Sequence, residues 1–331
     1  MNQALIQDVV SEVMRRLGTL SAGQGASRAE ASPARAPAAV VSHHGSDANG
    51  RFGIFDNVDA AVSAATDAQQ KLLKLSLDDR DAIVKLIKQI AKDNAQAWGK
   101  MELDETKIGR LDHKIEKLQI LELVPGVEFL RTAATSGSNG LCLEEFAPFG
   151  VIGIITPVTH SVPTLSANAV NMIAAGNAIV ANAHPSGVRC AAHAVREYNK
   201  AINAKFGIEH LITCIVPPTL ETADQIFNHR GISLLVVTGG PAVARAALKA
   251  SKRAIVAGPG NPPVVVDETA CLTNAAASIV KGGAYDNNLL CIGEKQVFCV
   301  DSVFDKLCDA IEKHGGMRLT NSQVVSLTRA A

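Results

Sequence analysis

The chain has 331 residues, of which 47% are hydrophobic and only 4% aromatic, so it can bury an α/β core built from Ala, Val, Ile and Leu. Its 32 basic and 32 acidic residues leave a formal net charge of zero, which argues against nucleic acid or an anionic membrane as a partner. No apolar run is long enough to span a bilayer and no secretory signal is recognisable, so we expect a cytoplasmic protein.

Residues 1–18 predict a short amphipathic helix. Apolar side chains recur at three- and four-residue steps between Leu5 and Leu17, and polar side chains occupy the other positions. Residues 19–51 are rich in Ala, Ser, Gly and Pro, a composition typical of a flexible linker. Because so short a helix is marginal in water, we expect it to fold on contact, either with its own domain or, as we favour, with another protein.

From residue 58 to about residue 121 the pattern is helical, and the rhythm changes after Phe149. Short Val- and Ile-rich runs then alternate with amphipathic stretches, a pattern typical of βαβ units around a buried parallel sheet. We expect strands at 151–155, 178–181, 211–216, 233–237, 263–266 and 296–300. We expect helices at 163–175, 187–204, 220–228, 241–250, 272–284 and 304–313.

Three loops that follow predicted strands are candidate ligand sites, because ligands of such sheets bind at the carboxyl ends of the strands. Their candidate residues are Thr156, Pro157, Thr159, His160, His184, Pro185, Ser186, Thr238, Gly239 and Gly240. A Thr-Gly-Gly turn before a helix suits the close approach of a diphosphate, although glycine is also common at such turns for steric reasons. A fourth, glycine-rich segment at 257–263 contains Gly258 and Gly260.

The seven cysteines lack the paired spacing of a zinc site, so we expect reduced thiols and no bound metal. Most of them fall inside strand or helix patterns, where a thiol usually acts as a small core hydrophobe. Cys291 differs because it lies on a short loop with polar neighbours, between the helix at 272–284 and the strand at 296–300. Cys291 is therefore the candidate nucleophile.

Four segments resemble the aldehyde dehydrogenase superfamily in order and spacing. They are APFGVIGIITPVTHSVPTLSANAVNMIAAGNAIV, VVTGGPAVARAA, AGPGNPPVVVDETA and YDNNLLCIGEK. Within the superfamily, residues 52–308 are similar to the CoA-acylating propionaldehyde and acetaldehyde dehydrogenases of bacterial microcompartments. The resemblance implies an α/β fold with a Rossmann-type parallel sheet: an NAD-binding domain with N-terminal helices at 52–257, and a partial α/β catalytic domain at 258–331.

The resemblance also implies oxidation of a short-chain aldehyde by NAD to an acyl-CoA. Cys291 would carry the acyl group as a thioester, and coenzyme A would then accept it. The backbone N–H of Cys291 and a side chain from the loop of Thr159 and His160 would hold the oxyanion; many relatives have asparagine where this chain has His160, which leaves the side-chain donor open. Hydrolytic members carry a glutamate at the position of Ala257, and its absence favours acyl transfer over release of a free acid.

The same resemblance assigns the cofactor-binding residues. Thr238, Gly239 and Gly240 would line the NAD diphosphate, and the loop of His184, Pro185 and Ser186 would line the adenosine side. The remaining members of the set are Thr156, Pro157, Gly258 and Gly260. The preference for NAD over NADP stays open.

The N-terminal helix on its linker is similar to the encapsulation peptides of such enzymes, which implies a shell protein as the partner of residues 1–18 and a place inside a microcompartment. Members of the family continue beyond the position of Ala331, so we expect a C-terminally incomplete chain with weak or absent activity, homo-oligomeric if complete. Two alternatives remain: a non-catalytic cargo or adaptor that binds the shell through its helix, and a dehydrogenase that releases free acid.

Overall fold

The computed structural model describes residues 50–330, so the expected targeting helix and all but the end of the linker lie outside the described residues. The described part begins with η1 (Arg51–Gly53) and β1 (Ile54–Phe55). Four helices follow, namely α2 (Val58–Leu72), α3 (Leu77–Asp93), α4 (Ala95–Thr106) and α5 (Leu111–Gln119). The helical pattern predicted from residue 58 onward is confirmed. In the described part of the chain, no helix has the length and apolar character needed to cross a membrane.

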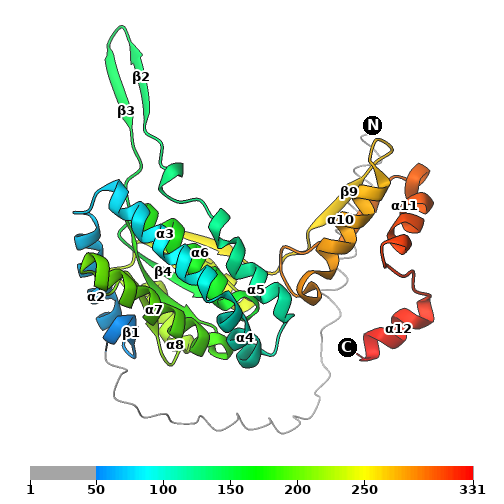
Figure 1. The fold of residues 1–331 in the computed structure, drawn as a ribbon, viewed down its shortest axis with the longest axis horizontal. Coiled ribbons are helices and arrows are strands. Elements are labelled where there is room, and N and C mark those ends of the chain that lie inside the picture. The colour runs from blue at the N-terminus through cyan, green and yellow to red at the C-terminus, as the bar shows by residue number, and fades with distance from the viewer. Residues whose placement is uncertain (1–49, 331) are drawn as a thin grey trace. The chain divides into compact units, whose positions relative to one another are not determined.

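A hairpin that the sequence analysis did not predict follows two 3-10 turns, η2 (Ile120–Leu123) and η3 (Val127–Phe129). It consists of β2 (Ala133–Gly137) and β3 (Gly140–Glu144), which pair antiparallel, and every residue of both strands is exposed. Figure 1 shows the hairpin extending away from the helices. Because neither strand buries a face, β2 lacks the run of large apolar residues by which strands are recognised in sequence.

The main sheet has six strands in the order β1-β6-β5-β4-β7-β8, and all neighbours are parallel. The strands after the hairpin are β4 (Val151–Thr156), β5 (Ala178–Ala183), β6 (Ile212–Ile215), β7 (Leu234–Thr238) and β8 (Ala254–Ala257). The helices between and after them are α6 (Ser161–Ala174), α7 (Val188–Phe206), α8 (Leu220–Asn228) and α9 (Pro241–Lys249). The predicted parallel α/β sheet is confirmed, with β1 and β8 as additional edge strands.

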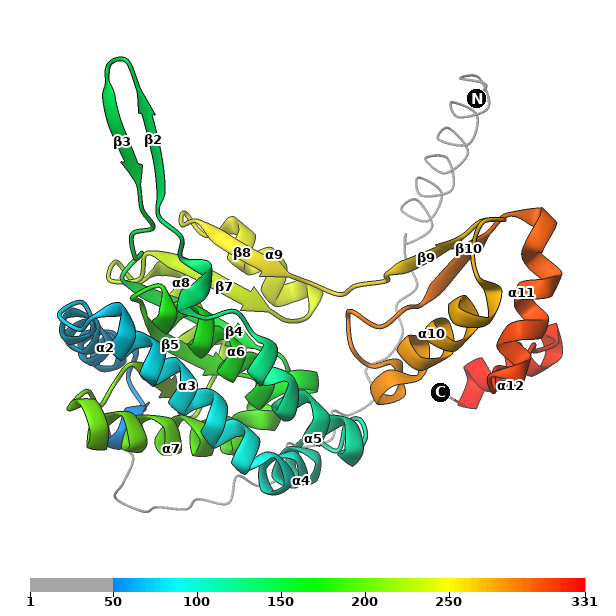
Figure 2. The same ribbon diagram turned by 45° about the horizontal axis from the view of Figure 1, so that its top comes forward.

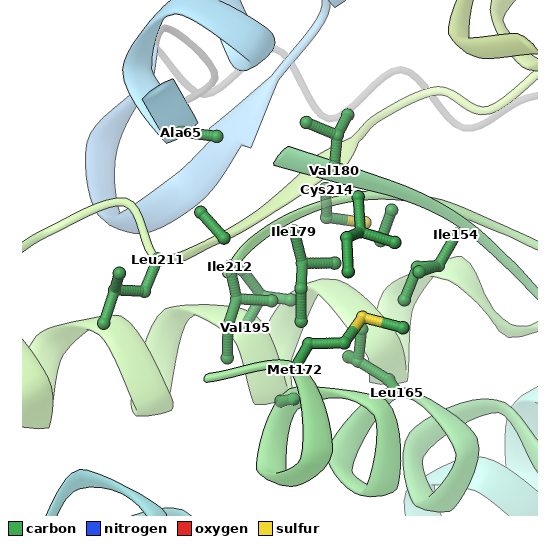
Figure 3. Packing of buried hydrophobic residues seen from close by; sticks show 14 of the residues in the cluster. Ala65, Ile154, Leu165, Met172, Ile179, Val180, Val195, Leu211, Ile212 and Cys214 are labelled. Carbon is green, nitrogen blue, oxygen red and sulfur yellow. The ribbon is translucent and has the colours of Figure 1, made fainter. Parts of the chain in front are cut away.

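Helices cover the sheet on both sides. Helices α6 and α7 pack on one face with α3 outside them, and α2 contacts β4, β5 and β6 from the other face together with α8. Figure 3 shows Ile179 pointing toward Met172 of α6, whereas Val180 points to the opposite side of the strand. All residues of β4, β5 and β6 are buried, as expected for central strands of a parallel sheet.

The chain after β8 forms a second, smaller sheet. Strands β9 (Pro263–Val266) and β10 (Gln296–Cys299) pair parallel, and α10 (Leu272–Ala284) lies beside β9 (Figures 1 and 2). The remaining elements are η6 (Tyr285–Asn288), α11 (Asp301–Lys313) and α12 (Asn321–Ala330). The expected boundary at 257/258 falls between β8 and β9.

Candidate functional site

Cys291 lies on the loop between η6 and β10, and it is partly buried. Three residues just before it, Asp286, Asn287 and Asn288, have positive φ angles of 51°, 57° and 58°. Asp and Asn tolerate this left-handed region better than other residues with a β-carbon. Gly260 lies close to the same loop, so close that a β-carbon on it would overlap the carbonyl oxygen of Cys291. Gly260 thus lets the 257–263 segment approach the candidate nucleophile.

Lys295 holds the loop of Cys291 by several hydrogen bonds. Its ammonium donates to the carbonyl oxygens of Asn288 at 3.0 Å and Leu290 at 2.9 Å, and to Oδ1 of Asn288 at 2.6 Å. The amide of Asn288 donates to the carbonyl oxygens of Gly283 at 2.5 Å and Glu294 at 3.0 Å. These bonds fix the backbone on both sides of Cys291.

Asp286 fixes the start of this loop to residues in and just before α5. Its side chain is fully buried; Oδ2 lies 2.5 Å from the ammonium of Lys117, and Oδ1 accepts the N–H of Arg110 at 2.9 Å. The N–H of Asp286 donates to Nδ1 of His113 at 2.8 Å. Gly109, with φ of 85°, makes room, because a β-carbon there would overlap the Asp286 carboxylate.

A second buried ion pair lies one helical turn earlier on α5. The ammonium of Lys114 lies 3.0 Å from Oε1 of Glu102, and both side chains are at most 1% exposed. The Glu102 carboxylate also accepts the N–H groups of Ser161 at 3.2 Å and Val162 at 3.4 Å, so it caps the N-terminus of α6. Burial lowers the pKa of Lys117, an effect opposed by Asp286 and reinforced by the charge of Lys114.

Buried polar atoms at the end of β4, in the loop that follows it and in α6 have no hydrogen-bond partner among the described residues. They are Oγ1 of Thr156, Nε2 of His160 and, farther along α6, Nδ2 of Asn168. Burial first, and then the charges of Lys117 and Lys114, lower the pKa of His160 to about 3. The imidazole is therefore neutral near pH 7. Because Nδ1 of His160 lies 3.3 Å from the hydroxyl of Thr164, that hydroxyl can donate to Nδ1 and leave the hydrogen on Nε2.

The two other predicted loops lie at the same edge of the sheet, since β5 and β7 flank β4 in parallel. Nδ1 of His184 accepts the N–H of Ser186 at 3.1 Å, and burial lowers the pKa of His184. Gly240 is the N-cap of α9 and makes no side-chain cap, and a β-carbon on it would meet no atom within 4 Å. The start of α9 is thus open to a ligand.

The sequence profile of the aldehyde dehydrogenase family matches residues 52–318. The chain belongs to the aldehyde dehydrogenase family. Its sequence is 41% identical over 299 residues to the acetaldehyde dehydrogenase (acetylating) of Bilophila wadsworthia, a match that covers 90% of this chain and 61% of that protein. The chain therefore spans about three fifths of the length of this relative.

Two solved structures show the same fold. The propionaldehyde dehydrogenase of Rhodopseudomonas palustris, with bound CoA and an acylated cysteine, superposes with a TM-score of 0.79 at 40% identity. The propionaldehyde dehydrogenase from the fucose utilisation bacterial microcompartment of Clostridium phytofermentans gives the same two values. Each match covers 83% of this chain and 64% of the other. The aldehyde-dehydrogenase-like fold expected from the sequence is confirmed.

The sequence analysis gave no role to the buried charges of this family member, Glu102, Lys114, Lys117 and Asp286. A signal was present, because Lys114 and Lys117 lie three residues apart, at positions that share a helix face with Leu118 and Leu121. A lysine on the apolar face of a helix needs a buried partner. Among the described residues, no group of three or more His, Cys, Asp or Glu side chains is arranged to hold a metal.

Proposed function

We propose that this chain carries the NAD-binding part and the nucleophile of a CoA-acylating aldehyde dehydrogenase that converts a short-chain aldehyde, propionaldehyde or acetaldehyde, to its acyl-CoA. The main support is the loop of Cys291, whose backbone is fixed by Lys295 and approached by Gly260. One relative named above is an acetylating acetaldehyde dehydrogenase, and one solved structure holds CoA and an acylated cysteine. In this proposal residues 52–257 bind the dinucleotide and residues 258–331 form part of the catalytic domain.

The open N-terminus of α9 fits a dinucleotide diphosphate. Gly239 and Gly240 place backbone at this end without side chains, and the uncapped N–H groups carry the positive end of the helix dipole. In the proposal, Thr156, Pro157 and Thr238 line the same edge, and His184, Pro185 and Ser186 line the adenosine side. Gly258 belongs to the same proposed cofactor-binding residues. Gly260 would act through its close approach to the carbonyl oxygen of Cys291.

The chemistry begins at the thiolate of Cys291, which attacks the aldehyde carbonyl and forms a carbon–sulfur bond. The oxyanion then accepts hydrogen bonds from the backbone N–H of Cys291 and from the loop of Thr159 and His160. Bound NAD would supply the acceptor for the hydride of the former aldehyde carbon, so that Cys291 would be left carrying the acyl group as a thioester. The thiolate of coenzyme A attacks this thioester, releases acyl-CoA and restores the Cys291 thiolate.

His160 fits the role of oxyanion donor if the Thr164 hydroxyl donates to Nδ1, which places the ring hydrogen on Nε2. A neutral imidazole with its hydrogen on Nε2 can donate to the oxyanion as the asparagine amide of relatives would. The low pKa of His160 keeps the ring neutral near pH 7, so the proposed donor is a neutral N–H group.

Ala257 supports transfer to CoA over release of acid. It ends β8 as an exposed residue without a carboxylate, so it cannot activate water. The thiolate of coenzyme A is a better nucleophile than water, so it can attack the thioester without a carboxylate at this position.

The proposal extends to location and partners. Residues 1–18 would bind a shell protein and place the enzyme inside a microcompartment, as supported by the microcompartment source of one solved relative. The complete enzyme would be a homo-oligomer. A fluorescent protein fused to residues 1–18 should co-sediment with shells, and a fusion in which Val9 and Val13 are replaced by Asp should not.

The central test is NADH formation from propionaldehyde and NAD, with and without CoA. Any turnover should require CoA, produce propionyl-CoA and be lost in Cys291→Ala. Cys142→Ala is the matched control, because Cys142 is an exposed thiol on the β2–β3 hairpin. Equal NADH formation without CoA would favour the acid-releasing alternative. NAD binding without any turnover would leave the binding part of the proposal standing and would fit both the expected weak or absent activity and the non-catalytic cargo protein.

A further inference from the structure

One buried lysine of α5 contacts both loops of the proposed site. The ammonium of Lys117, whose side chain is 2% exposed, lies 2.5 Å from Oδ2 of Asp286 at the start of the cysteine loop. The same ammonium donates to the carbonyl oxygen of Thr159 at 3.4 Å, in the loop that ends at His160. A single charged group thus connects the nucleophile loop to the proposed oxyanion loop.

Asp286, the partner of Lys117, belongs to the backbone segment just before Cys291. Its carboxylate and its N–H are both held by the α4–α5 region, through Arg110 and His113, and Tyr285 stacks on His113 with ring centroids 4.1 Å apart. Residues 286–288 all have left-handed backbone conformations, which persist only where the surroundings hold them. Loss of the ion pair should therefore release this segment first.

We propose that Lys117 is a positioning residue, which acts through Asp286 and Thr159 to keep the loop of Cys291 aligned with the loop of His160. The inference rests on the proposed function, since it concerns the same two loops. The charged groups around Lys117 are Asp286, Lys114 and Glu102, and His160 is the neutral group that their field affects.

The adjacent pair of Lys114 and Glu102 provides the matched comparison. It is as buried as the pair of Lys117 and Asp286 and lies on the same helix. Glu102, however, contacts the start of α6 and not the cysteine loop. A general loss of stability should follow from breaking either pair, whereas release of the Cys291 loop should follow only from breaking the second.

The test is the rate at which iodoacetamide alkylates each cysteine, followed by mass spectrometry across a pH series in wild type, Lys117→Met and Lys114→Met. The exposed Cys142 is the reference thiol, and the buried Cys190 and Cys214 report global unfolding. In Lys117→Met we expect the Cys291 rate to rise by about tenfold or more, which corresponds to about 1.4 kcal/mol of easier local opening. Cys142 should keep its rate, and Cys190 and Cys214 should stay protected. Lys114→Met should leave the Cys291 rate unchanged. Lys117→Arg keeps the positive charge, so its Cys291 rate should stay close to that of wild type.

A Cys291 rate in Lys117→Met that stays within about twofold of wild type, well below the tenfold step, would overturn the inference. So would an equal rise in Lys114→Met. If Lys117→Met unfolds, as shown by labelling of Cys190 and Cys214, Asp286→Asn takes its place with the same expectations, because the amide keeps the size and an acceptor for Arg110. The readout needs no turnover. NADH formation that needs neither CoA nor Cys291 would therefore count against the proposed function, while the alkylation rates still decide the role of Lys117.

Discussion

At the scale of single residues, Gly260 sets how closely two segments of the site approach. A β-carbon at this position would overlap the carbonyl oxygen of Cys291, which is backbone and cannot rotate away. We predict that Gly260→Ala displaces the cysteine loop, lowers stability by about 1–3 kcal/mol through overpacking and abolishes any NADH formation. Urea unfolding and the NADH assay measure both effects. Gly137→Ala is the control, because a β-carbon there meets no atom within 4 Å, and a similar loss in that variant would refute the explanation.

His160 makes the stability of the chain depend on pH. Its pKa in the folded protein is about 3, whereas an unfolded histidine has a pKa of about 6.5. The unfolded chain therefore binds a proton that the folded chain excludes as the pH falls from about 6.5 toward 3, and stability falls by up to about 1.4 kcal/mol per pH unit. We predict that His160→Gln reduces this dependence, as measured by urea unfolding at several pH values. An unchanged pH dependence would show that the imidazole is not held neutral.

The sequence predicted Cys291 as the candidate nucleophile because it lies on a polar loop, whereas most of the other cysteines fall inside strand or helix patterns. Lys117 and Asp286 could not be paired in the same way. They are 169 residues apart, and the sequence around either residue does not identify the other as its partner. The sequence shows that a lysine lies on the apolar face of a helix, but the partner of a buried charge follows only from tertiary structure.

At the scale of elements, the N-terminus of α6 depends on a carboxylate from another helix. Glu102 of α4 accepts two N–H groups of α6 and pairs with Lys114 of α5, so one side chain joins three helices. We predict that Glu102→Gln leaves Lys114 buried without a counter-charge and costs about 3–5 kcal/mol in urea unfolding. Adding Lys114→Met should recover most of this loss.

The control for this prediction is Asp104→Asn on the same helix. Asp104 pairs with Lys100 at 3.3 Å, but both side chains are more than half exposed, so breaking this pair should change stability little. A cost for Asp104→Asn as large as that for Glu102→Gln would mean that burial is not the cause.

The helices and strands that the sequence predicted well are those with at least one face buried in the core. Strands β4, β5, β6 and β7 and the helices between them follow the expected ranges within a few residues, because burial on both sides favours nearly continuous runs of apolar residues. The β2–β3 hairpin and the edge strands β1 and β8 were missed. The hairpin is fully exposed, β1 has only two residues, and β8 alternates between partly buried and exposed positions. Short or exposed strands leave too few apolar positions to detect.

At the scale of the whole molecule, apolar side chains are distributed unevenly. The hydrophobic core joins the six-stranded sheet to α2, α3, α6 and α7, while the small sheet of β9 and β10 contributes no residue to it. Large apolar side chains of these two strands are exposed instead, among them Val265, Val297 and Phe298. Exposed apolar residues on a short parallel sheet with open edges favour association with another surface.

We predict that the chain self-associates through β9 and β10 in a concentration-dependent way, as measured by sedimentation velocity. Phe298→Lys, which changes a residue that is 58% exposed, should shift the distribution toward monomer because it places a charge on the associating strand. Leu220→Lys is the matched control: Leu220 is 87% exposed at the start of α8, outside this sheet, and its replacement should leave the distribution unchanged. Equal effects of both substitutions would show that net charge controls association. A monomeric wild type over the whole concentration range would show that β9 and β10 are not a contact surface.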